Sequence, residues 1–225
     1  MKYVLVILLL LMVLCCVGCN NNKTIIETKT TKVSKTEYSI KDTTPTFQTK
    51  HVVDINNIEI KKRMAQVYEN YFNNKSKIVA IKANSFSILK KDIVCRQKLY
   101  EIMGYDAKDA QQMAIDTIIE SEIDFQQSLK CKIKISEKEL ASYIKEQISM
   151  AKKNQNNKSY LNYLRNISIE EVYRHEKNNI KKELAVDKYY NYLTEKYGEE
   201  NLNTEHRKVV EKVKKTENIQ ILIRP

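Results

Sequence analysis

The spacing of apolar residues predicts a mostly helical chain. Between residues 58 and 214, apolar side chains recur every three or four positions, which is the period of a helix with one buried face. Ser136 with Glu139 and Ser168 with Glu171 have the spacing of capping boxes at helix starts, and Asp106 with Asp109 is expected to open the helix that follows Gly104. The pattern predicts helices over residues 58–72, 89–103, 107–130, from 136 onwards, around 160–164, in one long stretch from 168 to 197, and over 204–214.

Two short runs depart from the helical period. Residues 77–83 and 219–223 are rich in β-branched side chains and read as strands. The turn pair Asn84-Ser85 follows the first run, and Ile88 with Leu89 begins the next helical pattern. We expect the two runs to pair as a two-stranded ribbon that joins the N- and C-terminal segments, and that packs on helices because a ribbon alone is only marginally stable.

The N-terminus predicts export. Residues 4–18 carry no charge, and an apolar run of about 15 residues is shorter than the roughly 20 that span a bilayer as a helix, which is typical of a secretory signal. Cys16-Val17-Gly18 before Cys19 resembles a bacterial lipobox, although Cys16 stands where leucine is usual. We therefore expect residues 1–18 to be a lipoprotein signal peptide and Cys19 to carry the lipid, with an uncleaved anchor or a plain secretory signal as alternatives.

Composition divides and restricts the rest of the chain. Residues 19–50 are rich in Thr, Lys and Asn without a sustained apolar period, which predicts a flexible polar tether, so the folded domain is expected over 51–225. The whole chain has three Gly and two Pro, which disfavours glycine-rich phosphate loops and many-stranded β architectures.

The net charge of +11 suggests an anionic neighbour, either lipid or a cell-wall polymer. Nucleic acid is disfavoured as a partner because the chain is exported and its lysines alternate with glutamates, as on solvated helix faces. The expected location is the extracytoplasmic face of a bacterial cell membrane, with attachment through the N-terminal lipid.

Candidate chemistry is sparse. Cys95 and Cys131 are predicted to be free thiols, because an antiparallel helix pair would hold them on the order of 15 to 20 Å apart. Paired carboxylates such as Glu120 with Glu122 or Glu199 with Glu200 are typical of exposed helices, and the Glu171/His175 pair is typical of a surface contact. We predict no catalytic residue, no metal site and no cofactor.

Tyrosine is the conspicuous residue type, with 14 Tyr and no Trp. Tyr has a flat apolar face with a polar tip and Met has a flexible apolar side chain, so together they suit a groove that holds many different sequences, although rim packing of a helical bundle would use tyrosines in the same way. The predicted peptide-binding residues are Tyr143, Met150, Tyr160, Tyr163, Tyr189 and Tyr190.

The order of these signals resembles a known family. Ile78-Val79-Ala80-Ile81-Lys82-Ala83-Asn84-Ser85-Phe86-Ser87-Ile88 followed by a helix is similar to the start of the SurA N-terminal domain, the chaperone module of PrsA-type foldase lipoproteins. Residues 104–105, 114–123, 133–140 and 160–171 are similar to later parts of that module, so the resemblance covers about residues 77–198. Ser85, Lys132 and Asn166 depart from it where glycine is frequent, and Leu89 departs from it where Ser or Thr is usual.

The resemblance implies a helical peptide-binding fold of the SurA-N and trigger-factor kind, and a membrane-anchored chaperone for unfolded or secreted polypeptides. The resemblance covers the chaperone module alone. The parvulin-type prolyl isomerase module of catalytic relatives has no counterpart, because fewer than about thirty residues remain after Tyr197. Two alternatives stay open: a peptidyl-prolyl cis-trans isomerase, and a structural lipoprotein with one dedicated partner in envelope or spore assembly.

Overall fold

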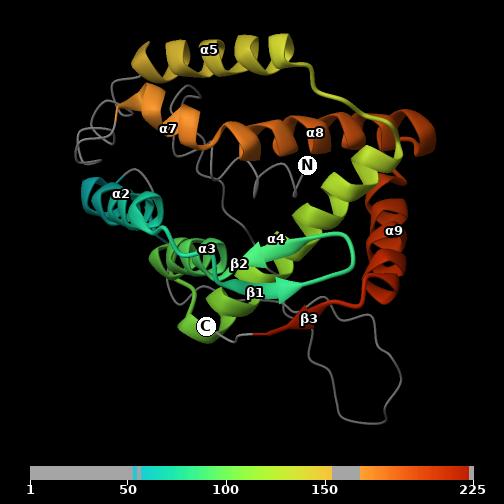
Figure 1. Cartoon of the computed structure of the whole chain (residues 1–225), viewed down its shortest axis with the longest axis horizontal. Coiled ribbons are helices and arrows are strands. Elements are labelled where there is room, and N and C mark those ends of the chain that lie inside the picture. The colour runs from blue at the N-terminus through green and yellow to red at the C-terminus, as the bar shows by residue number, and fades with distance from the viewer. Residues whose placement is uncertain (1–52, 55–56, 154–167, 223–225) are drawn as a thin grey trace.

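A computed structural model describes residues 53–54, 57–153 and 168–222 (Figure 1). The predicted signal peptide, Cys19, the tether and the predicted helix with Tyr160 and Tyr163 lie outside the described residues. The described part is mostly helical with a small antiparallel sheet, as predicted. In chain order its elements are α2 (Ile58–Asn73), β1 (Val79–Lys82), β2 (Ser87–Leu89), α3 (Lys90–Ile102), α4 (Ala107–Lys130), α5 (Glu137–Lys153), α7 (Ile169–His175), α8 (Lys177–Tyr197), α9 (Leu202–Thr216) and β3 (Gln220–Ile221).

The sheet confirms the predicted pairing of the two β-prone runs and adds a strand that was not predicted. Its order is β2-β1-β3, and Ile81 of β1 lies opposite Ile221 of β3. On its other side Ile81 lies opposite Ile88 of β2. The predicted two-stranded ribbon is therefore wrong by one strand, because Ser87, Ile88 and Leu89 extend the sheet before the helix begins. A three-residue strand is too short for its exposed-buried alternation to show in the sequence.

The helix starts follow the predicted signals. Asp106 accepts hydrogen bonds from the backbone N–H groups of Lys108 (3.1 Å) and Asp109 (3.0 Å) at the start of α4. The Ser136 hydroxyl accepts from Glu139 N–H at 3.1 Å at the start of α5. Each bond satisfies a backbone donor that the first helical turn leaves without a partner.

The long C-terminal helix is divided, which corrects the prediction of one continuous helix. The capping box of Ser168 and Glu171 is confirmed at the start of α7, but the chain leaves helical geometry at Glu176, where φ is −86° and ψ is 1°. The break allows α7 to pack against α5 while α8 packs against α4. Neither glycine nor proline occurs at the break, so the sequence carried no signal for it.

Two buried clusters organise the fold. The first, which we call the helical core, joins α2, α3, α5, α7 and α8 around side chains such as Met64, Leu140 and Tyr173. The second, which we call the sheet-side core, joins β1, β2, α3, α4 and α9 around Ile81 and Ile123. In Figure 1 helices α5 and α8 lie at the top, the sheet and α3 lie below, and α4 crosses between the two levels.

A cleft between α2, α3 and α8

The candidate site is a cleft of about 300 Å³ between the two levels of the fold. Its walls come from α2, β2, α3, α4 and the start of α8. Tyr68, Ile88 and Ile118 contribute apolar surface, and the remaining lining is largely polar and charged. The cleft therefore offers an apolar contact surface together with several ionisable groups.

Helical spacing explains why charged residues meet here. Glu176, Asn179 and Glu183 are three and four residues apart, so they lie on one face at the start of α8. Asp92 and Arg96 are likewise four residues apart on α3, which forms the opposite wall. Two helix faces that each look solvent-exposed in the sequence thus face each other across one cavity.

Glu183 is the most unusual group of the cleft. Its Oε2 atom is sealed from solvent and has no hydrogen-bond partner among the described residues. Burial, together with the negative charge of Glu176, raises the pKa of Glu183 to about 8, against the opposing effect of Arg96. A buried carboxyl group without a partner is costly, so this position invites a ligand that supplies a donor.

The neighbouring acids share this environment. Burial raises the pKa of Asp92, although the nearby Tyr71 hydroxyl and the Leu89 N–H, which donates to Asp92 Oδ2 at 3.3 Å, favour the ionised form. Burial also raises the pKa of Glu176, whose Oε2 accepts a hydrogen bond from Asn179 Nδ2 at 2.7 Å. The cleft is therefore rich in carboxyl groups that resist ionisation.

One of the two cations of the cleft, Lys182, is engaged by other residues. Lys182 Nζ lies 2.5 Å from Glu122 Oε1 and 5.3 Å from the centre of the Phe125 ring. Arg96 lines the cleft and lowers the pKa of Glu183, but it forms no ion pair with Glu183 in the described structure. The lining carries the four carboxyl groups of Asp92, Glu122, Glu176 and Glu183 against the two cations Arg96 and Lys182.

Cys95, the cysteine that lines the cleft, is not activated as a nucleophile. Burial raises the pKa of Cys95 to about 12, so the thiol stays protonated at neutral pH, and the thiolate is the reactive form. Cys131 caps the end of α4, and both cysteines are free, as predicted. Within the described ranges, no three His, Cys, Asp or Glu side chains gather closely enough to hold a metal ion.

The predicted tyrosine groove differs from this cleft. Tyr189 is 2 % exposed and belongs to the protein interior, whereas Met150 is 44 % exposed at the end of α5. Tyr143 is half-buried against the helical core, and Tyr190 takes part in a separate polar cluster. None of these four lines the cleft, and Tyr160 and Tyr163 lie outside the described residues.

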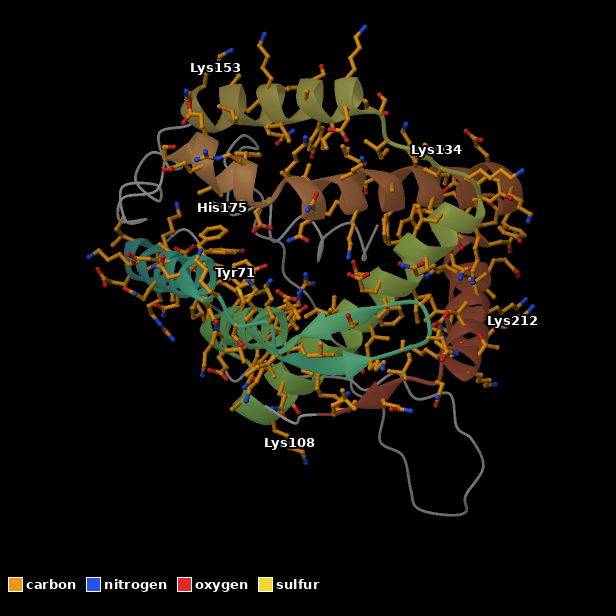
Figure 2. All side chains as sticks on the ribbon, in the orientation of Figure 1. Tyr71, Lys108, Lys134, Lys153, His175 and Lys212 are labelled. Carbon is orange, nitrogen blue, oxygen red and sulfur yellow. The ribbon has the colours of Figure 1, made fainter. Side chains whose placement is uncertain are left out.

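The tyrosines that line the cleft are Tyr68 and Tyr71 of α2. The sequence places both on the apolar face of a predicted helix but does not indicate that they belong to a site. Tyr71 carries Lys91 Nζ 4.9 Å above its ring, and burial raises the pKa of its hydroxyl well above the usual range. In Figure 2, Tyr71 and His175 lie on the same side of the molecule, where the Phe72 and His175 ring centres are 5.9 Å apart.

A second polar cluster joins α4, α8 and α9, and we call it the Asp124 network. Tyr190 donates a hydrogen bond to Asp124 Oδ2 at 2.9 Å, and His206 Nε2 lies 2.7 Å from Asp124 Oδ1 and 3.1 Å from the Tyr190 oxygen. Burial lowers the pKa of His206, but the hydrogen bond and charge of Asp124, with Glu120, outweigh it and leave that pKa above its usual value. The network is a closed structural unit.

The other predicted acid pairs have structural roles. Glu120 lies 4.0 Å from His206 Nδ1, and Glu122 pairs with Lys182, so both are half-buried rather than exposed. Glu171 closes the capping box of α7 and pairs with Arg174 at 3.1 Å. These contacts explain the residues without any catalytic function.

Basic side chains lie on several sides of the described part of the molecule. Lys108, Lys134, Lys153 and Lys212 point outwards from different sides of the molecule (Figure 2). None of the helices in the described part combines the length and the apolar character needed to cross a membrane. No protein-family model matches the chain, and neither the curated proteins nor the solved structures include a significant match to it.

Proposed function

We propose that this protein is a membrane-anchored, extracytoplasmic chaperone-like lipoprotein that binds unfolded or extended polypeptides. The observation that carries the proposal is the cleft between α2, α3 and α8, in which apolar surface lies beside a buried carboxyl oxygen of Glu183 that has no hydrogen-bond partner among the described residues. This site, and not the fold, supports the function, because a fold by itself does not fix an activity.

The size of the cleft favours an extended segment as the ligand. A volume of about 300 Å³ lies at the lower limit of typical ligand pockets and has room for one or two side chains, not for a folded partner. Apolar walls at Tyr68, Ile88 and Ile118 accept aliphatic or aromatic groups without requiring a fixed sequence. Such a site holds a chain that has not yet buried its own apolar residues.

The expected lipid anchor and the net charge support a location of this activity at a membrane. Lipidation of Cys19, followed by the polar residues 19–50, would hold the folded part near the bilayer surface. The net charge of +11, spread over several helices, would favour proximity to anionic lipid or cell-wall polymer. Both features suit the reception of polypeptides that have just crossed the membrane.

A refolding experiment tests the proposal. The full-length chain in detergent micelles is added to a chemically unfolded, aggregation-prone protein, and light scattering is followed against empty micelles. We expect suppression of aggregation near equimolar amounts. Acceleration of a proline-limited refolding phase at catalytic amounts would instead indicate an isomerase, and no effect on either process would contradict the chaperone proposal and favour a single dedicated partner.

A matched pair of variants assigns the effect to the cleft. Ser121→Phe introduces a bulky ring into the cleft wall on α4, whereas Ser142→Phe introduces the same ring on the exposed face of α5. We expect Ser121→Phe to abolish aggregation suppression and Ser142→Phe to retain it, with urea unfolding confirming that both variants fold. Equal activity of the two variants would place binding elsewhere.

A further inference from the structure

We propose that the cleft selects a lysine or arginine side chain of the bound polypeptide, and that the carboxyl group of Glu183 is its counter-ion. This inference rests on the proposed function and names the chemical class of segment that the cleft takes. It adds a charge requirement to a site that would otherwise accept any apolar segment.

A buried carboxyl oxygen of Glu183 favours a cationic ligand. Glu183 lines the cleft, and its Oε2 atom is buried without a hydrogen-bond partner among the described residues. Buried polar atoms in folded proteins are almost always paired, and those that are not are usually explained by a ligand, a water or a function. An ammonium or guanidinium group that enters the cleft would supply the missing donor.

The balance of acidic and basic residues in the cleft lining also favours a cationic ligand. Glu183 is accompanied by Glu176 on its own helix and by Asp92 on the opposite wall, so a cation would meet several acidic groups at once. Lys182, the lysine of the lining, is already paired with Glu122 at 2.5 Å and is therefore not the missing partner. The chain as a whole carries +11, whereas the lining has four carboxyl groups against two cations, Arg96 and Lys182.

The combination of apolar and acidic surface in the lining suits a lysine or arginine side chain. The long apolar stem of a lysine or arginine can lie along aliphatic and aromatic surface while its charged end reaches a polar group. Tyr68, Ile88 and Ile118 supply such surface in the same cavity as Glu183. A cationic side chain contacts both the apolar and the acidic part of the lining, whereas a purely apolar side chain would leave the Glu183 oxygen without a partner.

Binding should depend on pH. Because the pKa of Glu183 is raised to about 8, the group is mostly protonated at neutral pH, and a bound cation would favour ionisation and release a proton. Glu176 and Asp187 on α8, Asp92, Cys95 and Arg96 on α3, Tyr71 on α2, and Glu122 with Lys182 face the same region. A lysine side chain stays charged over this range, so affinity for it should rise about tenfold or more between pH 6.5 and 8.5.

Two peptides and one variant test the inference. The full-length chain in micelles is titrated with labelled peptides that differ only at one central residue, lysine in one and norleucine in the other, and anisotropy is corrected with empty micelles. We expect the lysine peptide to bind at least tenfold more tightly at pH 8.5, and Glu183→Gln to remove that preference. Glu195→Gln, at an exposed position of the same helix, should leave it intact.

The outcomes separate the inference from the function that it deepens. Equal binding of both peptides, unchanged by Glu183→Gln, would overturn the inference and leave a chaperone that reads apolar surface alone. Binding of neither peptide, with no suppression of aggregation, would overturn the proposed function as well. Equally tight binding of a free alkylamine would assign the site to a small cation and contradict a polypeptide ligand.

Discussion

Helix α8 borders two buried acid sites, and the hydrogen bonding of their carboxyl groups differs. The Asp124 network near Tyr190 is closed, since the Asp124 carboxylate has a partner at each oxygen. The cleft near Glu183, seven residues and about 10 Å earlier than Tyr190 on α8, leaves a buried oxygen without a partner in the described part of the chain. A stability role explains a closed network fully, whereas the open carboxyl group calls for a ligand.

The largest expected effect comes from breaking the closed network. Asp124→Asn removes the negative charge from His206 and should lower the free energy of unfolding by about 3 kcal/mol, because one member of a buried pair is left without its counter-charge. Urea unfolding followed by circular dichroism measures this loss. Asp116→Asn, a half-buried acid on the same helix, is the control and should change stability far less. Equal losses in both variants would contradict the role assigned to the network.

In the cleft, removal of the buried acid is expected to raise the free energy of unfolding, not to lower it. Glu183 has its folded pKa raised from the ordinary 4.5 to about 8, so the native state holds a proton that the unfolded chain loses above pH 4.5. The free energy of unfolding therefore falls as the pH rises from about 4.5 to 8, and Asp92, Glu176 and Asp187, whose pKa values are also raised, act in the same direction.

Replacing Glu183 should make this fall shallower. We expect Glu183→Gln to be more stable than the parent chain by about 2 kcal/mol at pH 9 and to differ little from it near pH 4.5. Urea unfolding at a series of pH values provides the measurement. A variant less stable than the parent at pH 9 would show that Glu183 has a stabilising partner and would remove the contrast between the two sites.

The smallest expected change in stability comes from Tyr190 of the Asp124 network. Tyr190→Phe removes the hydroxyl that donates to Asp124 but keeps the ring that lies 5.0 Å from that of His206. We expect a loss of about 1 kcal/mol in the free energy of unfolding, typical of one buried hydrogen bond, and unchanged peptide binding. Loss of binding with stability intact would restore Tyr190 to the peptide-binding residues that the sequence suggested.

Local signals in the sequence predicted much of the fold. Capping residues such as Asp106, Ser136 and Ser168 act within one helical turn, so their effect can be read from neighbouring positions. The pairing of β1 with β3 was also predicted, because β-branched runs are rare in this chain. The resemblance to the SurA N-terminal domain stays a prediction.

The cleft could not be predicted, because it depends on tertiary packing. Asp92 and Glu183 each lie on a helix face that reads as exposed, and only the packing of α8 opposite α3 brings the two faces together. The break at Glu176, which separates α7 from α8, carries no glycine or proline signal. The tyrosine pattern pointed to Tyr189, which is instead buried in the interior.

Photo-crosslinking tests the central claim, that the cleft is where a polypeptide binds, most directly. A photoreactive phenylalanine analogue is placed at Tyr71 in the cleft wall or, as the control, at Tyr192, which is 39 % exposed elsewhere on α8. We expect an unfolded polypeptide carrying lysines to be crosslinked at position 71, and position 192 to give only background. Equal yields at both positions, or none at position 71 while aggregation is still suppressed, would contradict it.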